Sequence, residues 1–128
     1  MPSPARAGVL IYASDLDRLA SFYELLLDMQ RVNASAEHVV LTSPDMQLII
    51  HAIPAHIGAT FEIKSPPERR DETAIKPFFT VANLDDAGTL MARLGASLDT
   101  QQWHGPGFRV RNGMDPEGNV IQLREFVS

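Results

Sequence analysis

The sequence Leu10-Ile-Tyr-Ala-Ser-Asp-Leu-Asp-Arg-Leu-Ala-Ser-Phe-Tyr23 recurs in weaker form as Phe78-Phe-Thr-Val-Ala-Asn-Leu-Asp-Asp-Ala-Gly-Thr-Leu-Met91. Aligning Asp15 with Asn83 pairs apolar with apolar residues at nearly every position. Both copies have the pattern of a short strand, a capping residue and an amphipathic helix. Such self-similarity usually marks one supersecondary unit that is used twice. The sequence therefore predicts a pseudo-symmetric fold, with any pocket lying where the two units meet.

The first unit spans residues 7–53 and is predicted to run strand, helix, strand, strand, strand. An apolar run at 7–13 has the length of a buried strand. Asp15 or Ser14 can accept the free N–H groups at the start of the following helix. The apolar residues of that helix recur at three- and four-residue spacing, which gives one face for packing on a sheet. The remaining strands are expected at 29–34, 38–42 and 46–53.

Residues 54–73 have the Pro, Gly and charge content of an exposed connection and are interpreted as a linker. The second unit, 74–128, repeats the plan, with a strand at 75–82, Asn83 as the cap and a helix over 84–94. Its further strands are expected near 97–103, 108–112 and 119–126. The prediction is an α+β fold of tandem βαβββ units, whose curved mixed sheets form a concave cup with the helices on the convex side.

Length and composition limit the classes of function. A chain of 128 residues that is 45% hydrophobic has the size and mixture of one globular domain. A net charge of −5 without a basic stripe argues against a nucleic-acid partner. The absence of Cys excludes disulfides and thiolate chemistry. No signal peptide or membrane-spanning run is recognisable, so we expect a cytoplasmic protein with no membrane partner.

Three features together resemble the vicinal oxygen chelate superfamily. They are the tandem βαβββ plan, the strand-to-helix junction that ends in Phe22-Tyr23, and the turn Asp115-Pro-Glu-Gly-Asn119 with the strand after it. This superfamily groups glyoxalase I, extradiol dioxygenases, fosfomycin resistance enzymes and bleomycin resistance proteins. The resemblance covers almost the whole chain and implies the fold. Because the same scaffold holds metal enzymes and metal-free binders, the activity has to be judged from the site.

The positions that this resemblance assigns to metal ligands carry poor donors. Gly8 stands where the metal enzymes place a His on the first strand, and the equivalent residue of the second unit is Lys76. Gln122 stands where a Glu is usual, and its neutral amide is a weaker donor than a carboxylate. The fourth position falls at Ile50, or at Leu48 if the pairing slips by one pleat. The sequence therefore predicts no metal and no cofactor.

The histidines do not supply an obvious replacement. They lie at His38, His51, His56 and His104, without the spacing of a two-His metal site. A scattered His is more often a surface or hydrogen-bonded residue than a ligand. The acidic pairs at the two helix starts are explained by capping and the helix dipole, so no catalytic residue is predicted.

Alternation along the strands predicts which side chains line the cup. Trp103 precedes the loop His104-Gly-Pro-Gly107 and offers a flat face for stacking, with core or subunit packing as an equal alternative. Arg111 could meet an anionic ligand, although strand arginines are mostly solvated. The residues expected on the same concave face as Gly8 include Thr80, Val120 and Arg124, and also Leu48 on the fourth strand. The predicted ligand-binding residues are Leu10, Tyr12, Ile50, Lys76, Phe78, Trp103, Arg111 and Gln122.

An apolar lining with a few polar groups is typical of a pocket for a small organic molecule. The leading hypothesis is a metal-free protein that sequesters a small hydrophobic or aromatic compound, in the manner of bleomycin resistance proteins. One alternative is a metal-dependent lyase or dioxygenase whose ligands are displaced to His38 or His51 alongside Gln122. Another is an interaction domain with an empty cup. A homodimer is expected, because each half of the cup leaves a sheet face uncovered.

Overall fold

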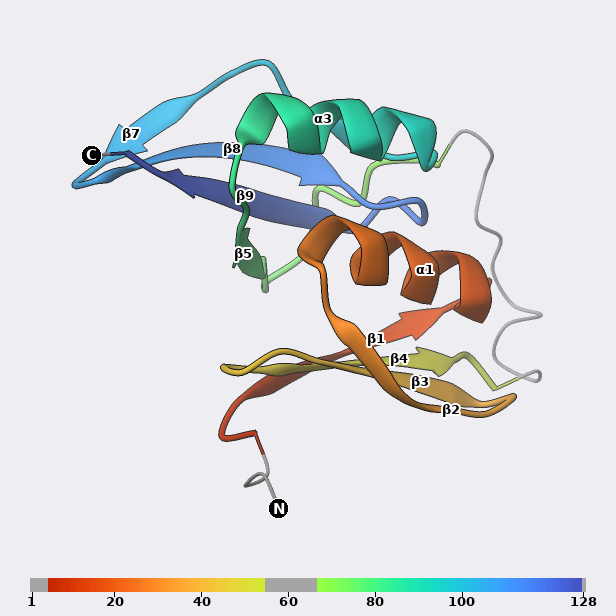
Figure 1. The fold of residues 1–128 in the computed structure, drawn as a ribbon. Coiled ribbons are helices and arrows are strands. Elements are labelled where there is room, and N and C mark those ends of the chain that lie inside the picture. The colour runs from red at the N-terminus through yellow and green to blue at the C-terminus, as the bar shows by residue number, and fades with distance from the viewer. Residues whose placement is uncertain (1–4, 55–66, 128) are drawn as a thin grey trace. The chain divides into compact units, whose positions relative to one another are not determined.

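The computed structural model describes residues 5–54 and 67–127, which belong to two compact units, Met1–Glu62 and Ile63–Ser128. Each unit is a mixed sheet with one helix against it, so the α+β class is confirmed (Figure 1). The boundary between the units falls inside the predicted linker. Neither of the described helices has the length and apolar character that a membrane span requires.

The described part of unit 1, residues 5–54, forms one helix and a four-stranded sheet in the order β1-β4-β3-β2. Strand β1 pairs with β4 in parallel, and the other pairs are antiparallel. The helix begins after Asp15, whose carboxylate accepts a hydrogen bond from the Arg18 N–H at 3.2 Å, as the capping pattern predicts. The elements are β1 (Gly8–Ala13), α1 (Leu16–Leu27), β2 (Gln30–Ala34), β3 (His38–Thr42) and β4 (Gln47–Ala52).

Unit 2 repeats this order with β5-β9-β8-β6, while the short strand β7 also pairs with β8. Strands β1 and β5 occupy equivalent places, because each is parallel to the last strand of its own unit. Helix α3 begins at Leu84 after the cap Asn83, so the predicted repeat is confirmed. The elements are β5 (Phe78–Thr80), α3 (Leu84–Arg93), β6 (Ser97–Leu98), β7 (Trp103–Gly105), β8 (Phe108–Met114) and β9 (Val120–Phe126).

Two strands of unit 2 are shorter than predicted. The strand expected at 75–82 begins only at Phe78, because Pro77 has no N–H to donate to the ladder and its carbonyl only accepts, from the Gln122 N–H at 3.0 Å. The strand expected near 97–103 is two short strands, β6 and β7, joined by polar residues. Lys76 therefore lies before β5, exposed and outside the sheet.

The core of unit 1 lies between α1 and one face of its sheet, where Phe22 and Tyr23 of the helix are almost fully buried. Leu48 and Ile50 face this core and are 0% exposed. The interpretation of these two residues as cup residues is therefore wrong. The opposite face of the sheet stays open, and Leu10 and Tyr12 are about half exposed on it, at 47% and 56%.

The turn between β8 and β9 is fixed by a buried carboxylate. Asp115 is 0% exposed, and its Oδ1 accepts hydrogen bonds from the backbone N–H groups of Glu117 and Asn119. Gly118 has φ +86°, and a Cβ there would lie 2.0 Å from the Glu68 carbonyl oxygen. The turn therefore needs glycine at this position. It sets the register in which Met114 of β8 faces Val120 of β9.

Candidate ligand site on the open sheet face of unit 2

The candidate site is the face of the unit 2 sheet on which Gln122 and Arg124 of β9 project, hereafter the open face of unit 2. Cross-strand partners share a face, so the register assigns Phe78 of β5, facing Gln122, to this side. On β8, the other neighbour of β9, Asn112 faces Gln122 in the same way and so shares this face. Trp103 of β7 faces Val110, which in turn faces Arg124. Three elements of the sheet beside β9 thus contribute side chains to one surface.

Arg124 lies among aromatic rings on this surface. The Cζ atom of its guanidinium lies 3.9 Å from the ring centroid of Phe78 and 4.7 Å from that of Phe108. Both distances are within the range in which a cation is attracted to the face of a ring. Phe78 and Trp103 remain 55% and 43% exposed. The surface therefore offers flat apolar area around one cation.

The Gln122 amide holds this guanidinium in place and is itself bound to the amide of Asn112. The Gln122 Oε1 accepts hydrogen bonds from the Arg124 Nε and Nη2 at 3.4 and 3.2 Å. The Gln122 Nε2 donates to the Asn112 Oδ1 at 3.3 Å. Because the amide oxygen is already accepting from a cation, Gln122 orients Arg124 and is poorly placed to bind a metal ion.

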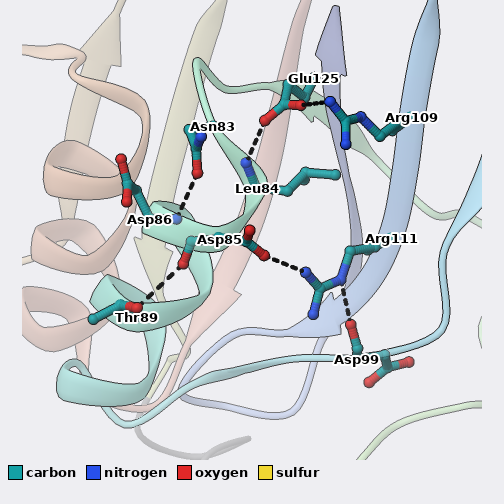
Figure 2. A network of polar contacts seen from close by, with 9 residues as sticks. All are labelled: Asn83, Leu84, Asp85, Asp86, Thr89, Asp99, Arg109, Arg111 and Glu125. Atoms are coloured by element: carbon teal, nitrogen blue, oxygen red, sulfur yellow. Dashed lines mark hydrogen bonds and ion pairs between the residues drawn. The ribbon is translucent and has the colours of Figure 1, made fainter. Parts of the chain in front are cut away.

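Arg111, a predicted ligand-binding residue, does not belong to this surface. It alternates with Asn112 along β8 and lies on the helix-covered side, where its Nε donates to the Asp99 carbonyl at 2.6 Å (Figure 2). Its Nη1 also lies 3.3 Å from the Asp85 carboxylate at the start of α3. These contacts tie the sheet to its helix.

The other predicted residues of unit 2 separate into two groups. Phe78, Gln122 and Trp103 share the open face with Arg124. Lys76 precedes β5 and has no place in the ladder. Whether any of these residues binds a ligand stays a prediction.

The open face of unit 1 carries an unexpected aromatic row. Tyr12 faces His51 across β1 and β4, and His51 faces His38 across β4 and β3. The Tyr12 and His51 rings meet edge to face with centroids 5.6 Å apart, and the two imidazoles are stacked with centroids 6.3 Å apart. The turn between β3 and β4 makes neighbours of two histidines that are distant in sequence.

The hydrogen-bond partners of these two rings indicate a tautomer for each neutral imidazole. The Ala52 carbonyl can only accept, so the His51 Nδ1, 2.7 Å away, carries a hydrogen and leaves Nε2 as the acceptor of the neutral ring. The Ser35 hydroxyl accepts from two backbone N–H groups and can donate its own hydrogen to the His38 Nδ1 at 3.3 Å. In the neutral pair one imidazole therefore presents an acceptor and the other a donor.

The donor set does not fit the metal site that the fold suggests. A Cβ at Gly8 would lie 2.8 Å from the Gln47 carbonyl oxygen, which leaves no room for a ligating side chain. Ile50 faces the core, and Gln122 is bound to Arg124. Within residues 5–54 and 67–127, no three His, Cys, Asp or Glu side chains lie together as a metal ion would require. His56 lies outside the described residues.

Sequence reasoning placed Arg124 on the correct face but did not select it for the site. Its neighbours Phe78 and Phe108 come from strands on either side of β9, so their approach follows from the sheet order alone. Asn112 was also missed, because its position opposite Gln122 depends on how β8 pairs with β9. The turn that joins these two strands sets this register, and it was the signal in the sequence that could have identified Asn112.

Comparisons with solved structures identify the fold. A glyoxalase/bleomycin resistance protein/dioxygenase family enzyme from Burkholderia phytofirmans PsJN has a TM-score of 0.71 and 17% identity, over 97% of this chain and 100% of that one. The fosfomycin resistance protein FosX from Listeria monocytogenes has a TM-score of 0.67 and 13% identity, over 99% and 96%. A glyoxalase/bleomycin resistance protein from Albidiferax ferrireducens T118 has a TM-score of 0.67 and 17% identity, over 94% and 98%.

Sequence comparison adds nothing to this structural likeness. No family model matches the chain, and no curated protein matches it. The similar structures include a resistance protein and a family enzyme, so they share a scaffold rather than one activity. The chain thus has the fold of the vicinal oxygen chelate superfamily, the glyoxalase/bleomycin resistance/dioxygenase fold.

Proposed function

We propose that this protein binds a small planar organic compound on the open face of unit 2, without the help of a metal ion. The observation that carries the proposal is the part-buried Arg124, held by Gln122 and flanked by Phe78 and Phe108. Ligand sites are typically apolar surfaces with a few placed polar groups. Here the aromatic rings supply area, and the guanidinium supplies direction.

Trp103 gives this proposal an optical and energetic test. It is the only Trp of the chain. It lies on β7, two strands away from Arg124 on β9 with Val110 of β8 between them, which places the two backbones roughly 10 Å apart. A planar uncharged probe, naphthalene-2-carboxamide, should quench its fluorescence on binding. In calorimetric titration, Trp103→Ala should weaken binding of this probe by about 1 to 3 kcal/mol, the range for loss of an aromatic anchor.

The matched control removes an exposed apolar side chain elsewhere. Leu25 of α1 is 56% exposed and lies in unit 1, so Leu25→Ala should leave the affinity unchanged. Saturable binding that depends on Trp103 and not on Leu25 supports the proposal. No binding of the probe, or equal loss in both variants, would overturn it.

A metal-dependent lyase or dioxygenase with displaced ligands is the second candidate, and the neighbouring His38 and His51 favour it. Metal analysis of protein purified without chelator tests this candidate directly. We expect no stoichiometric Ni, Zn, Fe or Mn, and no fall in melting temperature when a chelator is added. Stoichiometric metal that is lost in a His38→Asn, His51→Asn double variant would instead establish the second candidate.

A third candidate, an interaction domain with an unused surface, predicts neither metal nor probe binding. A thermal-shift screen separates it from the first, since a compound that binds the folded state must raise its stability. The homodimer stays a prediction, and light scattering of the purified protein is its test.

A further inference from the structure

We infer that the ligand of the open face of unit 2 carries a carboxylate, which binds end-on to the two terminal nitrogens of Arg124. This inference rests on the proposed function and adds to it the charge and the shape of the ligand. It follows from the hydrogen bonds that Arg124 makes and from those that it leaves open.

A guanidinium has five N–H groups in one plane. The Gln122 Oε1 accepts from Nε and from one hydrogen of Nη2, which occupies one edge of that plane. The adjacent edge, formed by Nη1 and the second hydrogen of Nη2, remains available. This pair of parallel donors matches the two oxygens of a carboxylate.

The six arginines of unit 2 differ in their partners. Arg69, Arg109 and Arg111 each lie within 4.0 Å of at least one carboxylate. The hydrogen bond to Asp99, followed by that to Asp71, raises the pKa of Arg69 above its usual value. Among the described residues, neither the part-buried Arg70 and Arg124 nor the exposed Arg93 has a carboxylate partner. Of these three, Arg124 is the one that lies against aromatic rings on the open face of unit 2. A ligand anion would supply the missing negative charge.

The Arg124 Cζ atom lies 3.9 Å from the Phe78 ring centroid and 4.7 Å from that of Phe108. Trp103 shares this face of the sheet. These rings can contact an aromatic or other planar group of a bound acid. The geometry therefore favours a planar aromatic acid over a small inorganic anion.

The experiment compares an anionic and a neutral probe of the same size and shape, naphthalene-2-carboxylate and naphthalene-2-carboxamide, by calorimetry at neutral pH. The acid is ionised there. The wild-type protein should bind the acid at least about tenfold more tightly than the amide, because charge-assisted bidentate bonds are stronger than neutral ones. Arg124→Gln should reduce this ratio to about one.

Two further variants make the result specific. Arg93 is exposed near the end of α3, so Arg93→Gln removes the same charge from unit 2 and should keep the wild-type ratio. Arg124→Lys keeps the charge without the planar fork and should give an intermediate ratio. If Arg124→Gln fails to fold, the Lys variant alone decides.

The outcomes separate this inference from the proposed function. If the wild type does not bind the amide, the proposed function fails. If both bind with equal affinity, or if Arg124→Lys keeps the full preference for the acid, the face binds small molecules but the carboxylate inference is wrong. A preference for the acid that survives in Arg124→Gln would also overturn it.

Discussion

Asp115→Ala is expected to destabilise the protein by about 3 to 5 kcal/mol. The carboxylate is 0% exposed and accepts the Glu117 N–H at 2.9 Å, the Asn119 N–H at 3.0 Å and the Asn119 Nδ2 at 2.8 Å. Hydrogen bonds to a charged group contribute more than neutral ones, and their loss leaves several buried donors unsatisfied. Denaturant unfolding with a two-state fit measures the change.

Asp115→Asn is the matched control for this prediction. Its Oδ1 can still accept the two backbone N–H groups, but its Nδ2 would meet the Asn119 Nδ2 donor. The Asn variant should therefore lose clearly less stability than the Ala variant. An Ala variant within about 1 kcal/mol of the wild type would mean that the turn holds its shape without the carboxylate.

The general fold could be predicted because its signals are local. Asp15 and Asn83 cap their helices at the expected residues, and the apolar spacing of each helix identifies the face that it buries. The repeat then relates two strands that the structure shows in equivalent places. These features depend on residues within a few positions of one another, which is the range over which sequence patterns are informative.

The faces of the strands could be predicted only in part. Side chains alternate along every strand, but the phase between strands depends on the turns that join them. On β4 the residues that share a face with Gly8 are Gln47, Ile49 and His51. The alternation assumed from the sequence for this strand is the opposite one, and it therefore assigned Ile50 to the cup instead of the core. On β8 the residue that faces Gln122 is Asn112, whereas Arg111 lies on the helix-covered side of the sheet.

The candidate site shows the same limit more sharply. Phe78, Phe108 and Arg124 lie on three different strands, and their meeting depends on the order β5-β9-β8. The pairing of His38 with His51 likewise depends on one turn. The sequence pattern identifies each strand but not which strands are neighbours in the sheet. Contacts between side chains of different strands therefore cannot be predicted without the strand order.

Glu125→Ala is expected to cost about 2 to 4 kcal/mol of stability, because this buried carboxylate joins the last strand to the start of α3. Its Oε1 accepts the Leu84 N–H at 2.8 Å, and its Oε2 lies 3.1 Å from the Arg109 Nη2 (Figure 2). The Leu84 N–H is one of the amides at a helix start that have no partner within the helix. Thermal or denaturant unfolding measures the loss.

Glu125→Gln separates the two contacts. Its amide oxygen can still accept the Leu84 N–H, whereas its NH₂ group would face the Arg109 donor in place of a carboxylate. The Arg109 Nε is already buried without a partner among the described residues, so weakening its only ion pair should cost about 1 to 2 kcal/mol. A Gln variant as unstable as the Ala variant would show that the ion pair, and not the helix contact, dominates.

The same variant also tests whether the two faces of β9 are independent. Glu125 and Arg124 are adjacent in the chain, but their side chains project to opposite sides of the sheet. Glu125→Gln should therefore lower stability while the affinity for naphthalene-2-carboxylate stays at the wild-type value. Arg124→Gln should do the reverse, lowering that affinity with a smaller effect on unfolding. If Glu125→Gln weakened binding as much as Arg124→Gln, the anchoring of α3 would control the position of Arg124, and the open face could not be treated as a preformed surface.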